Sequence, residues 1–456
     1  MKEKYIRQNM AEYGEEYEKI NFCTANDSAI FEKKRIELIN SISKHTSWGY
    51  CNTKTDCNNL SEGCRLCGEG LWSCLFINGR CNAKCFYCPA PQNEDCLPTT
   101  NTVNFSSAAE YVAYLKRFGF KGVSISGGEP LLTPELTFSY IKAVREAFGD
   151  EMYIWMYTNG LLVTEHILDK LKCAGLNEIR FDIGATGYSL SNLSKAIGKV
   201  PVVTVEIPAV PEEIEQLKII VKQLAELGVN HLNLHQLRLT PTNFEKMMQR
   251  NYTYIHNESV PVIESELTAL QIIDHTLQNN IKLPINYCSY TYKNRFQGVA
   301  ARKRNCTEMV KLHEEVTENG YIRLITLKGD ETDIMPVAGA MSLHTGRYEL
   351  SRDKKTLCIH PSLINLADIS KLDLMLSYFS AKQLQSMSYK NPFKTIQLTS
   401  KKNIVIERFR ASNDITLSIG EAYDFIGFMT DKTCTPLPPA IVQEYEIIKQ
   451  NLLEYL

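Results

Sequence analysis

Short apolar runs alternate with amphipathic stretches through the middle of the chain. Six of these runs have the length and the β-branched or aromatic content of strands. Several of the stretches between them repeat apolar residues with the period of a helix. Because alternating strands and helices form a parallel sheet covered by helices, the pattern predicts an α/β fold. The expected strands are 73–79, 121–126, 152–157, 178–183, 202–207 and 231–236.

The helices expected between these strands carry start and stop signals. Ser107 opens one of them as the first half of a capping box with Glu110. Pro134 stands at the first position of the next, where its missing N–H costs nothing. Two more are expected over 164–175 and 212–227.

The flanking regions have different patterns. Within residues 1–70, the sequence pattern predicts helices over 5–20 and 30–43, followed by a cysteine-rich, turn-like stretch. Beyond residue 306, the runs 320–326 and 403–409 predict strands, and 369–378 and 441–456 predict helices. We therefore expect three parts, which are a helical and cysteine-rich N-terminal extension (1–70), an α/β part (71–305) and a C-terminal α+β domain (306–456).

Composition narrows the possible partners and the compartment. The net charge is −2, so there is no electrostatic case for nucleic acid as a partner. No apolar run reaches the length of a membrane-spanning helix, and the charged start at Met1 lacks the apolar core of a signal peptide. Fifteen cysteines without an export signal favour a reducing, cytoplasmic location and metal binding over disulfides.

Three of these cysteines, Cys81, Cys85 and Cys88, are spaced C-x3-C-x2-C directly after the first expected strand. Three thiolates on one loop can hold three irons of a [4Fe–4S] cluster and leave the fourth iron open to a small molecule. For such a motif alone, the alternatives are a zinc site or ordinary buried cysteines.

A second motif, Gly127-Gly128-Glu129-Pro130, ends the second expected strand. The two glycines allow the backbone to approach a ligand closely. Glu129 offers a carboxylate for an ammonium group, and Pro130 ends the strand. A zinc site would leave this motif unexplained.

Together, in this order, the two motifs resemble the signature of the radical S-adenosylmethionine (radical SAM) superfamily. The resemblance implies a partial (β/α)6 TIM-like barrel with ligand-binding groups at the C-terminal ends of its strands. It also implies a [4Fe–4S] cluster on the three cysteines and S-adenosylmethionine on the open iron. Reduction then splits this cofactor into methionine and a 5′-deoxyadenosyl radical, with an electron donor such as flavodoxin or ferredoxin as partner.

The resemblance also suggests positions for the cofactor. Tyr87 is expected beside the cluster and the adenine, and residues 127–130 at the methionine end. By position alone, Asn159 and Asp182 correspond to groups that contact the ribose, although Asn159-Gly160 could be a plain turn and Asp182 an interior polar residue. The adenine is expected near Ile207 and the backbone around His235, whose ring could also bind substrate or serve structure only.

A second group of cysteines precedes the cluster motif. Cys57, Cys64, Cys67 and Cys74 could hold a structural zinc or a second iron–sulfur cluster. The alternative is a set of free thiols without metal. The cysteines farther along, Cys306, Cys358 and Cys434, are too scattered to form the cysteine array of SPASM-type peptide maturases.

The stretch 285–298 combines aromatic, amide and cationic side chains and suits a flat, polar small-molecule substrate. An alternative is a solvated connector. The expected substrate contacts are Gln236, Asn286, Tyr287, Lys293, Arg295 and Gln297.

The function expected from these features is hydrogen abstraction from a small cytosolic metabolite, followed by bond cleavage or rearrangement. Within that class the chain resembles queuine lyase in size and in the flat-ligand chemistry of 285–298, so a lyase acting on a modified nucleobase is the specific expectation. Alternatives are a peptide-modifying maturase with an auxiliary cluster, a glycyl-radical activase and a non-catalytic cluster-binding scaffold.

Overall fold

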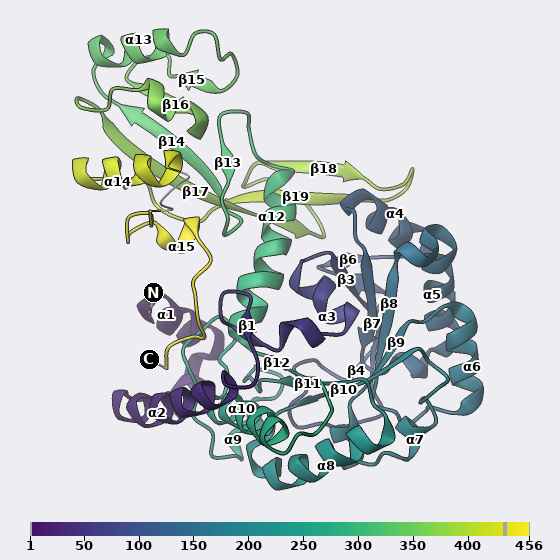
Figure 1. The fold of residues 1–456 in the computed structure, drawn as a ribbon. Coiled ribbons are helices and arrows are strands. Elements are labelled where there is room, and N and C mark those ends of the chain that lie inside the picture. Colours follow the sequence, from purple (N-terminus) through teal and green to yellow (C-terminus); the bar gives the residue numbers. More distant parts are fainter. Residues whose placement is uncertain (1, 432–435, 456) are drawn as a thin grey trace. The chain divides into compact units, whose positions relative to one another are not determined.

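The computed structural model describes residues 2–431 and 436–455, so Cys434 lies outside the described residues. The chain forms two compact units. One contains residues up to 100, 104–297 and 450 onward, and the other contains 101–103 and 298–449. Residues 2–70 therefore share a unit with the central α/β region, and the last residues of the chain return to that unit (Figure 1).

The first unit is built on a parallel sheet whose strands follow one another in chain order. This arrangement confirms the predicted α/β fold, and it is consistent with a partial barrel of the TIM type. All six expected strands are present, with a seventh beside them. The strands are β3 (Trp72–Arg80), β7 (Gly122–Gly127), β8 (Tyr153–Thr158), β9 (Glu178–Phe181), β10 (Val202–Pro208), β11 (His231–His235) and β12 (Ile285–Cys288).

Strand β12 was not expected, because its four residues include the polar Asn286 and no clear alternation. It pairs in parallel with β11, with Asn286 opposite Asn233. The short antiparallel strands β4 (Asn93–Glu94) and β5 (Thr99–Thr100) lie against β3 at the other edge.

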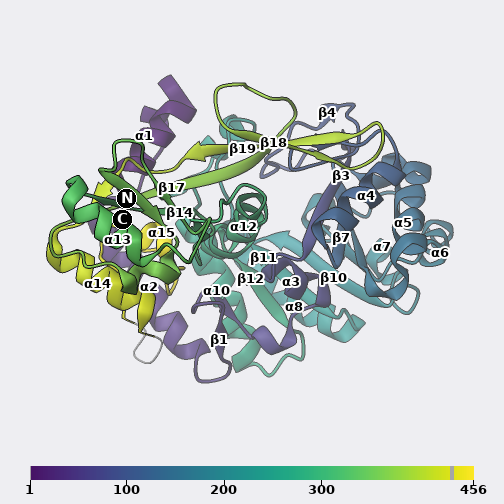
Figure 2. The same ribbon diagram turned by 90° about the horizontal axis from the view of Figure 1, so that it is seen from above.

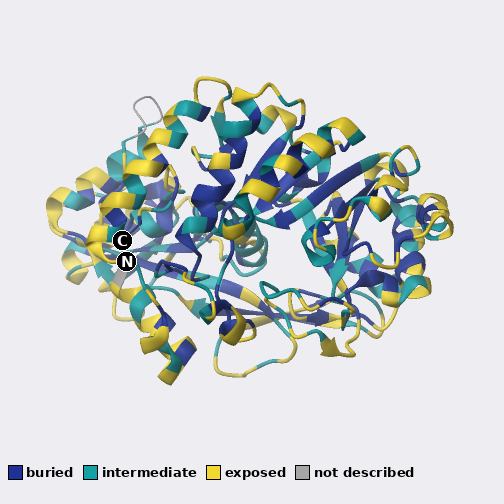
Figure 3. Ribbon diagram, turned by 90° about the horizontal axis from the view of Figure 1, so that it is seen from below, coloured by how far each residue is buried: buried dark blue, intermediate teal, exposed yellow. Residues whose placement is uncertain are grey.

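Helices cover the outer face of this sheet, where strand residues such as Ile125, Ile154 and Val205 are fully buried. In Figures 1 and 3 these helices lie outside the strands and expose one side of each. The helices are α4 (Ala108–Phe118), α5 (Pro134–Phe148), α6 (Glu165–Ala174), α7 (Ser191–Ser194), α8 (Ile214–Leu227) and α10 (Ile263–Gln278). The short helix α9 (Phe244–Met248) instead packs in a cluster that Phe86 and Tyr87 of the cysteine loop join.

The N-terminal residues contribute to both faces of the sheet. Helix α1 (Lys2–Tyr13) is followed by α2 (Ala25–Ile42), which packs on α10 through an ion pair between Arg35 and Glu266. The cysteine-rich stretch forms β1 (Trp48–Gly49), β2 (Lys54–Thr55) and α3 (Glu62–Gly68). This segment packs on the inner face, with α3 against β3, β7 and β8, and β2 against β12 (Figure 2).

The second unit is an antiparallel sheet with helices, in agreement with an α+β fold. Its main strands follow the order β15 (Tyr348–Leu350), β16 (Thr356–Ile359), β14 (Ile322–Lys328), β17 (Asp373–Leu384), β19 (Asn403–Arg410) and β18 (Phe393–Gln397). Short strands β13 (Glu315–Val316) and β20 (Ile415–Thr416) pair at its sides. The helices are α12 (Val299–Thr307), α13 (Glu331–Ala340), α14 (Ile419–Thr430) and α15 (Gln443–Glu446).

Two helix predictions were wrong. Residues 369–378 were expected to be helical, but most of them belong to β17, where Leu374, Leu376 and Tyr378 alternate into the core. The apolar spacing there has a period of two, which tertiary packing selects over the local helix propensity. Of the range 441–456, only α15 is helical. No helix among the described residues combines the length and apolarity needed to cross a membrane.

Candidate functional site at the C-terminal ends of the strands

The three motif cysteines lie on one loop that starts where β3 ends. Cys81, Cys85 and Cys88 are partly buried free thiols. Burial raises the pKa of Cys81, and it raises that of Cys85 to about 11, with further increases from the charges of neighbouring cysteines. These shifts favour the protonated thiols, and a bound metal would favour the thiolate forms. Three sulfur donors on one loop therefore fit a [4Fe–4S] cluster.

The GGEP motif is pressed against the strand that leads into this loop. The Gly128 N–H donates to the Asn78 carbonyl at 2.9 Å, and the Glu129 N–H donates to the Arg80 carbonyl at 2.7 Å. A Cβ on Gly128 would lie 1.9 Å from the Arg80 oxygen, and one on Gly127 would lie 2.3 Å from the Asn78 oxygen. The glycines were expected to make room for a ligand, but here they make room for the chain's own backbone just before Cys81.

Glu129 is buried and joins the ends of two strands. Its carboxylate accepts the N–H of Asn159 at 2.7 Å, the N–H of Leu131 at 3.0 Å and the hydroxyl of Thr158 at 3.0 Å. Burial raises the pKa of Glu129, while these hydrogen bonds lower it. A carboxylate can accept about four hydrogen bonds, so one position is left for a donor such as an ammonium group.

Asn159 follows β8 and reaches the cysteine loop. Its Nδ2 donates to Asn82 Oδ1 at 2.7 Å and lies 3.7 Å from Cys81 Sγ, while its Oδ1 accepts the Leu161 N–H. The side chain thus caps the Asn159-Gly160 turn, which was the alternative to a ribose contact. It also holds the loop that carries the thiols. The ribose contact remains a prediction.

Tyr87 and Asp182 meet across the mouth of the sheet. The Tyr87 hydroxyl lies 2.9 and 3.0 Å from the two carboxylate oxygens of Asp182. Burial raises the pKa of Asp182 to about 6, although the hydrogen bond from Tyr87 lowers it. Gly184 makes room for this hydroxyl, since a Cβ there would lie 2.9 Å from it. The contact fixes the tyrosine ring within the cysteine loop.

A row of charged side chains crosses the inner face of the sheet. Arg180 bridges Glu178 at 2.8 Å and Glu206 at 2.7 Å, and Glu206 Oε1 lies 2.5 Å from His235 Nε2. Lys293 Nζ lies 2.8 Å from His235 Nδ1. Only His235 and Lys293 of this row were singled out from the sequence. Glu206 could have been found in the sequence as the lone carboxylate at an inward position of an otherwise apolar strand.

The protonation states in this row follow from its contacts. Burial would raise the pKa of Glu206, but Arg180 and His235 hold it well below its usual range. Burial and the Lys293 charge lower the pKa of His235. A neutral His235 that donates from Nε2 to Glu206 and accepts at Nδ1 from Lys293 satisfies all three groups. Its side chain remains 29% exposed.

Some expected substrate contacts bind the chain's own groups instead. Gln236 donates to the Val262 carbonyl at 3.2 Å and accepts the Tyr290 N–H at 3.1 Å. Asn286 accepts from Lys54 Nζ at 2.5 Å. Two more are Arg295, which donates to the carbonyls of Gln450 and Asn451, and Gln297, whose amide lies 2.7 Å from Cys67 Sγ.

Two further expected contacts lie on the outer face of the sheet. Tyr287 alternates with Asn286, and its hydroxyl donates to Glu266 on α10 at 2.9 Å. Ile207 alternates with Glu206 and is buried beneath the helices. The structure thus brings neither side chain to the inner wall.

The cysteines of the N-terminal group lie in different surroundings. Cys57 Sγ lies 3.3 Å from the Lys54 carbonyl, and Cys74 is hydrogen-bonded to serines of β7. Cys64 contacts Asn233, and Cys67 lies near Cys64 and Cys288. In the described part of the chain no three Cys, His, Asp or Glu side chains converge as ligands of a single ion. A metal at the N-terminal group remains a prediction. The cysteines at 81–88 would bind separate irons of a cluster, so their sulfur atoms need to lie farther apart than the ligands of a single ion.

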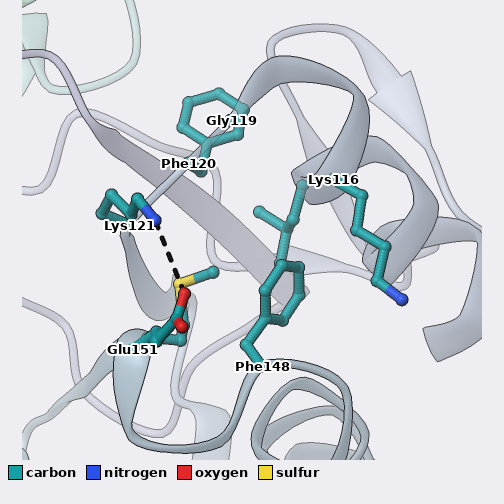
Figure 4. Close-up of a pocket in the computed structure, with 8 residues that line it drawn as sticks. Lys116, Gly119, Phe120, Lys121, Phe148 and Glu151 are labelled. Carbon is teal, nitrogen blue, oxygen red and sulfur yellow. Dashed lines mark ion pairs between the residues drawn. The ribbon is translucent and has the colours of Figure 1, made fainter.

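A surface pocket of about 240 Å³ lies away from these residues (Figure 4). Residues 119–121 of its lining directly precede β7, and Glu151 and Met152 directly precede β8. It is therefore at the N-terminal ends of the strands, opposite the cysteine loop. An ion pair of 3.7 Å between Lys121 and Glu151 crosses it.

Comparison with known proteins agrees with the motif and the topology. Residues 75–201 match the model of the radical SAM superfamily. A Methanocaldococcus jannaschii protein, provisionally named a glycyl-radical enzyme activating enzyme, is 29% identical over 67% of this chain and 84% of its own length. GTP 3′,8-cyclase of Rhodopirellula baltica is 32% identical over 24% of this chain and 30% of its own length.

Among solved structures, Streptococcus suis SuiB bound to S-adenosylmethionine matches 66% of this chain and 67% of its own, at 14% identity and a TM-score of 0.38. The matched segment of the family model contains the cysteine loop, the GGEP motif and strands β7 to β9. The cofactors of such a domain are a [4Fe–4S] cluster and S-adenosylmethionine. The chain contains a radical SAM domain, matched over residues 75–201.

Proposed function

We propose that this enzyme uses the 5′-deoxyadenosyl radical to abstract hydrogen from a small polar metabolite at the mouth of the barrel. The observation that carries the proposal is the filling of the inner face. Residues 48–68 occupy much of it, with Lys54 bonded to Asn286 on β12 and Gly63 packed against Arg180 on β9. A substrate is left with the end of the barrel that bears the cysteine loop.

Within this proposal, Cys81, Cys85 and Cys88 would hold the cluster. When bound, the cluster supplies the electron that splits S-adenosylmethionine. Glu129 offers its one remaining acceptor position to the ammonium group of the cofactor, and Asp182 lies beside the ring of Tyr87 where ribose hydroxyls are expected. The chain's own residues thus bind and orient the cofactor.

The substrate would meet a wall that is polar and charged. Glu206, His235 and Lys293 present hydrogen-bonding groups at the ends of β10, β11 and β12, on the same side as the cysteine loop. Buried polar groups of this kind fix the orientation of a small ligand. Cleavage or rearrangement of the substrate radical would follow.

A lyase acting on a modified nucleobase such as queuine is the specific form of this proposal. It depends on Tyr290 and Lys293 as stacking and hydrogen-bonding partners. The amides of Asn286 and Gln297, which were expected to read such a base, are engaged within the chain. Support for this substrate is therefore confined to two side chains.

A second candidate is activation of a glycyl-radical protein. It is favoured by the name of the Methanocaldococcus jannaschii relative, which aligns over 67% of this chain. Under this candidate, the partner's glycine rather than a metabolite would lose hydrogen at the barrel mouth.

One experiment separates the two candidates. Reconstituted, reduced enzyme is supplied with S-adenosylmethionine and with either the small-molecule or the protein fraction of a cell extract. A rise in 5′-deoxyadenosine with the small-molecule fraction alone supports the proposal. A rise with the protein fraction alone, together with a glycyl-radical doublet in the EPR spectrum, establishes the activase instead.

A further inference from the structure

We infer that Lys293 and Arg238 form a binding site for an anionic group, a carboxylate or a phosphate, on the substrate. The inference rests on the proposed function and adds to it the charge of the molecule to be recognised. Both cations lie beside the ring of Tyr290. Lys293 Nζ is 4.7 Å from the ring centroid, and the guanidinium carbon of Arg238 is 5.4 Å from it.

These residues are placed by neighbouring strands. Arg238 follows the C-terminal end of β11, and Tyr290 and Lys293 follow that of β12. Because parallel strands end on one side of a sheet, all three are on the side of the cysteine loop. Lys293 also begins a π-helical turn, Lys293–Gly298, a distortion that is frequent at functional sites.

Neither cation pairs with a carboxylate in the described part of the chain. Among the described residues, no carboxylate forms an ion pair with Lys293 or Arg238, and Nε of Arg238 is buried without a hydrogen-bond partner. An ammonium group has three donors. Lys293 uses one of them, toward the neutral ring of His235. Two charges without an ion-pair partner in a partly buried site are costly unless a ligand neutralises them.

The other buried cations of this unit differ in this respect. Arg180 lies between Glu178 and Glu206, and Arg35 pairs with Glu266. Lys54 lacks a carboxylate but donates to two oxygens, Asn286 Oδ1 and the Tyr287 carbonyl. Lys293 and Arg238 therefore stand out as cations with donors left to bind.

His235 acts here as a positioning residue. Glu206 holds its Nε2 and leaves Nδ1 directed at Lys293, so the ammonium group is held over the Tyr290 ring. A planar anion with two oxygens could then contact Lys293 and Arg238 together.

The carboxylate of S-adenosylmethionine is a second anion at the same mouth. The experiment must distinguish it from a group on the substrate. Reconstituted enzyme saturated with S-adenosylmethionine is titrated with inorganic phosphate by calorimetry, and the affinity for S-adenosylmethionine is measured separately without phosphate. The variants are K293M and R238M, with K172M on the exposed face of α6 as control.

We expect phosphate to bind at one site per chain, with affinity at least tenfold lower in K293M and in R238M and unchanged in K172M. Affinity for S-adenosylmethionine should stay within twofold of that of the wild type in all three. Absence of phosphate binding to the wild type, or equal binding by all variants, would overturn the inference. A tenfold loss of S-adenosylmethionine affinity in K293M or R238M would also overturn it, because the anion bound there would be the cofactor's own.

The titration needs no turnover. A failure of the proposed function, seen as no response of 5′-deoxyadenosine to small molecules, is therefore distinguishable from a failure of this inference. Iron content and thermal unfolding of each variant exclude misfolding as the cause of lost binding.

Discussion

The carbonyl oxygen of Arg80 occupies the space that a side chain on Gly128 would need, at 1.9 Å from an ideal Cβ. Through this contact the GGEP motif sets the position of the backbone directly before Cys81. The GGEP motif and the start of the cysteine loop are thus one packed unit.

The substitution Gly128→Ala should therefore disrupt the cysteine loop. The methyl group meets backbone, which cannot move aside as a side chain can, so we expect a loss of about 1–3 kcal/mol in stability and less iron bound after reconstitution. Gly427→Ala is the control, because Gly427 lies in α14 with nothing within 4 Å of a Cβ. Equal iron content in both variants would contradict the packing argument.

The contribution of the hydrogen bond from Tyr87 to Asp182 to the free energy of unfolding should depend on pH. Asp182 has a pKa of about 6 because of burial, so it is charged at pH 8 and largely neutral at pH 5. Hydrogen bonds to charged groups contribute about 1.5–3 kcal/mol and those to neutral groups less. Tyr87→Phe should thus destabilise the protein more at pH 8 than at pH 5 in urea unfolding. The same loss at both values would argue against an ionised Asp182, and Tyr423→Phe, at an exposed tyrosine, is the control.

His235 should also make stability fall at low pH. Burial and Lys293 lower its pKa in the folded protein, so the unfolded chain binds the proton more tightly. Stability linked to this residue is complete above the unfolded pKa, about 6.5, and falls as the pH drops below it. His235→Gln should flatten this part of the profile relative to wild type, whereas His166→Gln, at an exposed position on α6, should not. An unchanged slope in His235→Gln would show that folding does not shift the pKa of this ring.

Iron stoichiometry tests the N-terminal cysteines. Because Cys57, Cys64, Cys67 and Cys74 contact different partners, we expect about four irons per chain, from one [4Fe–4S] cluster, and no zinc by elemental analysis. Cys64→Ala should keep that number. A value near eight, reduced by the substitution, would establish a second cluster.

The sequence predicted the parts of the molecule whose pattern is local. Apolar runs bounded by turn residues predicted the parallel sheet of the first unit. The spacing of the cysteines and the run Gly-Gly-Glu-Pro predicted the cysteine loop and the GGEP motif. Strand β12 was missed because four residues with a polar side chain give no period, and β17 was taken for a helix because its core contacts come from β14 and β19. The role of Arg180 depends on carboxylates 2 and 26 positions away in the chain, which only the parallel register brings together.

The central claim is that Cys81, Cys85 and Cys88 hold a cluster that cleaves S-adenosylmethionine. Its most direct test is the yield of 5′-deoxyadenosine from anaerobically reconstituted, reduced enzyme, compared between wild type, Cys85→Ala and Cys173→Ala, where Cys173 is exposed on α6. We predict 5′-deoxyadenosine from the wild type and from Cys173→Ala, and none above background from Cys85→Ala. Equal yields from all three proteins, or no product from a wild type that contains its full iron, would contradict the account.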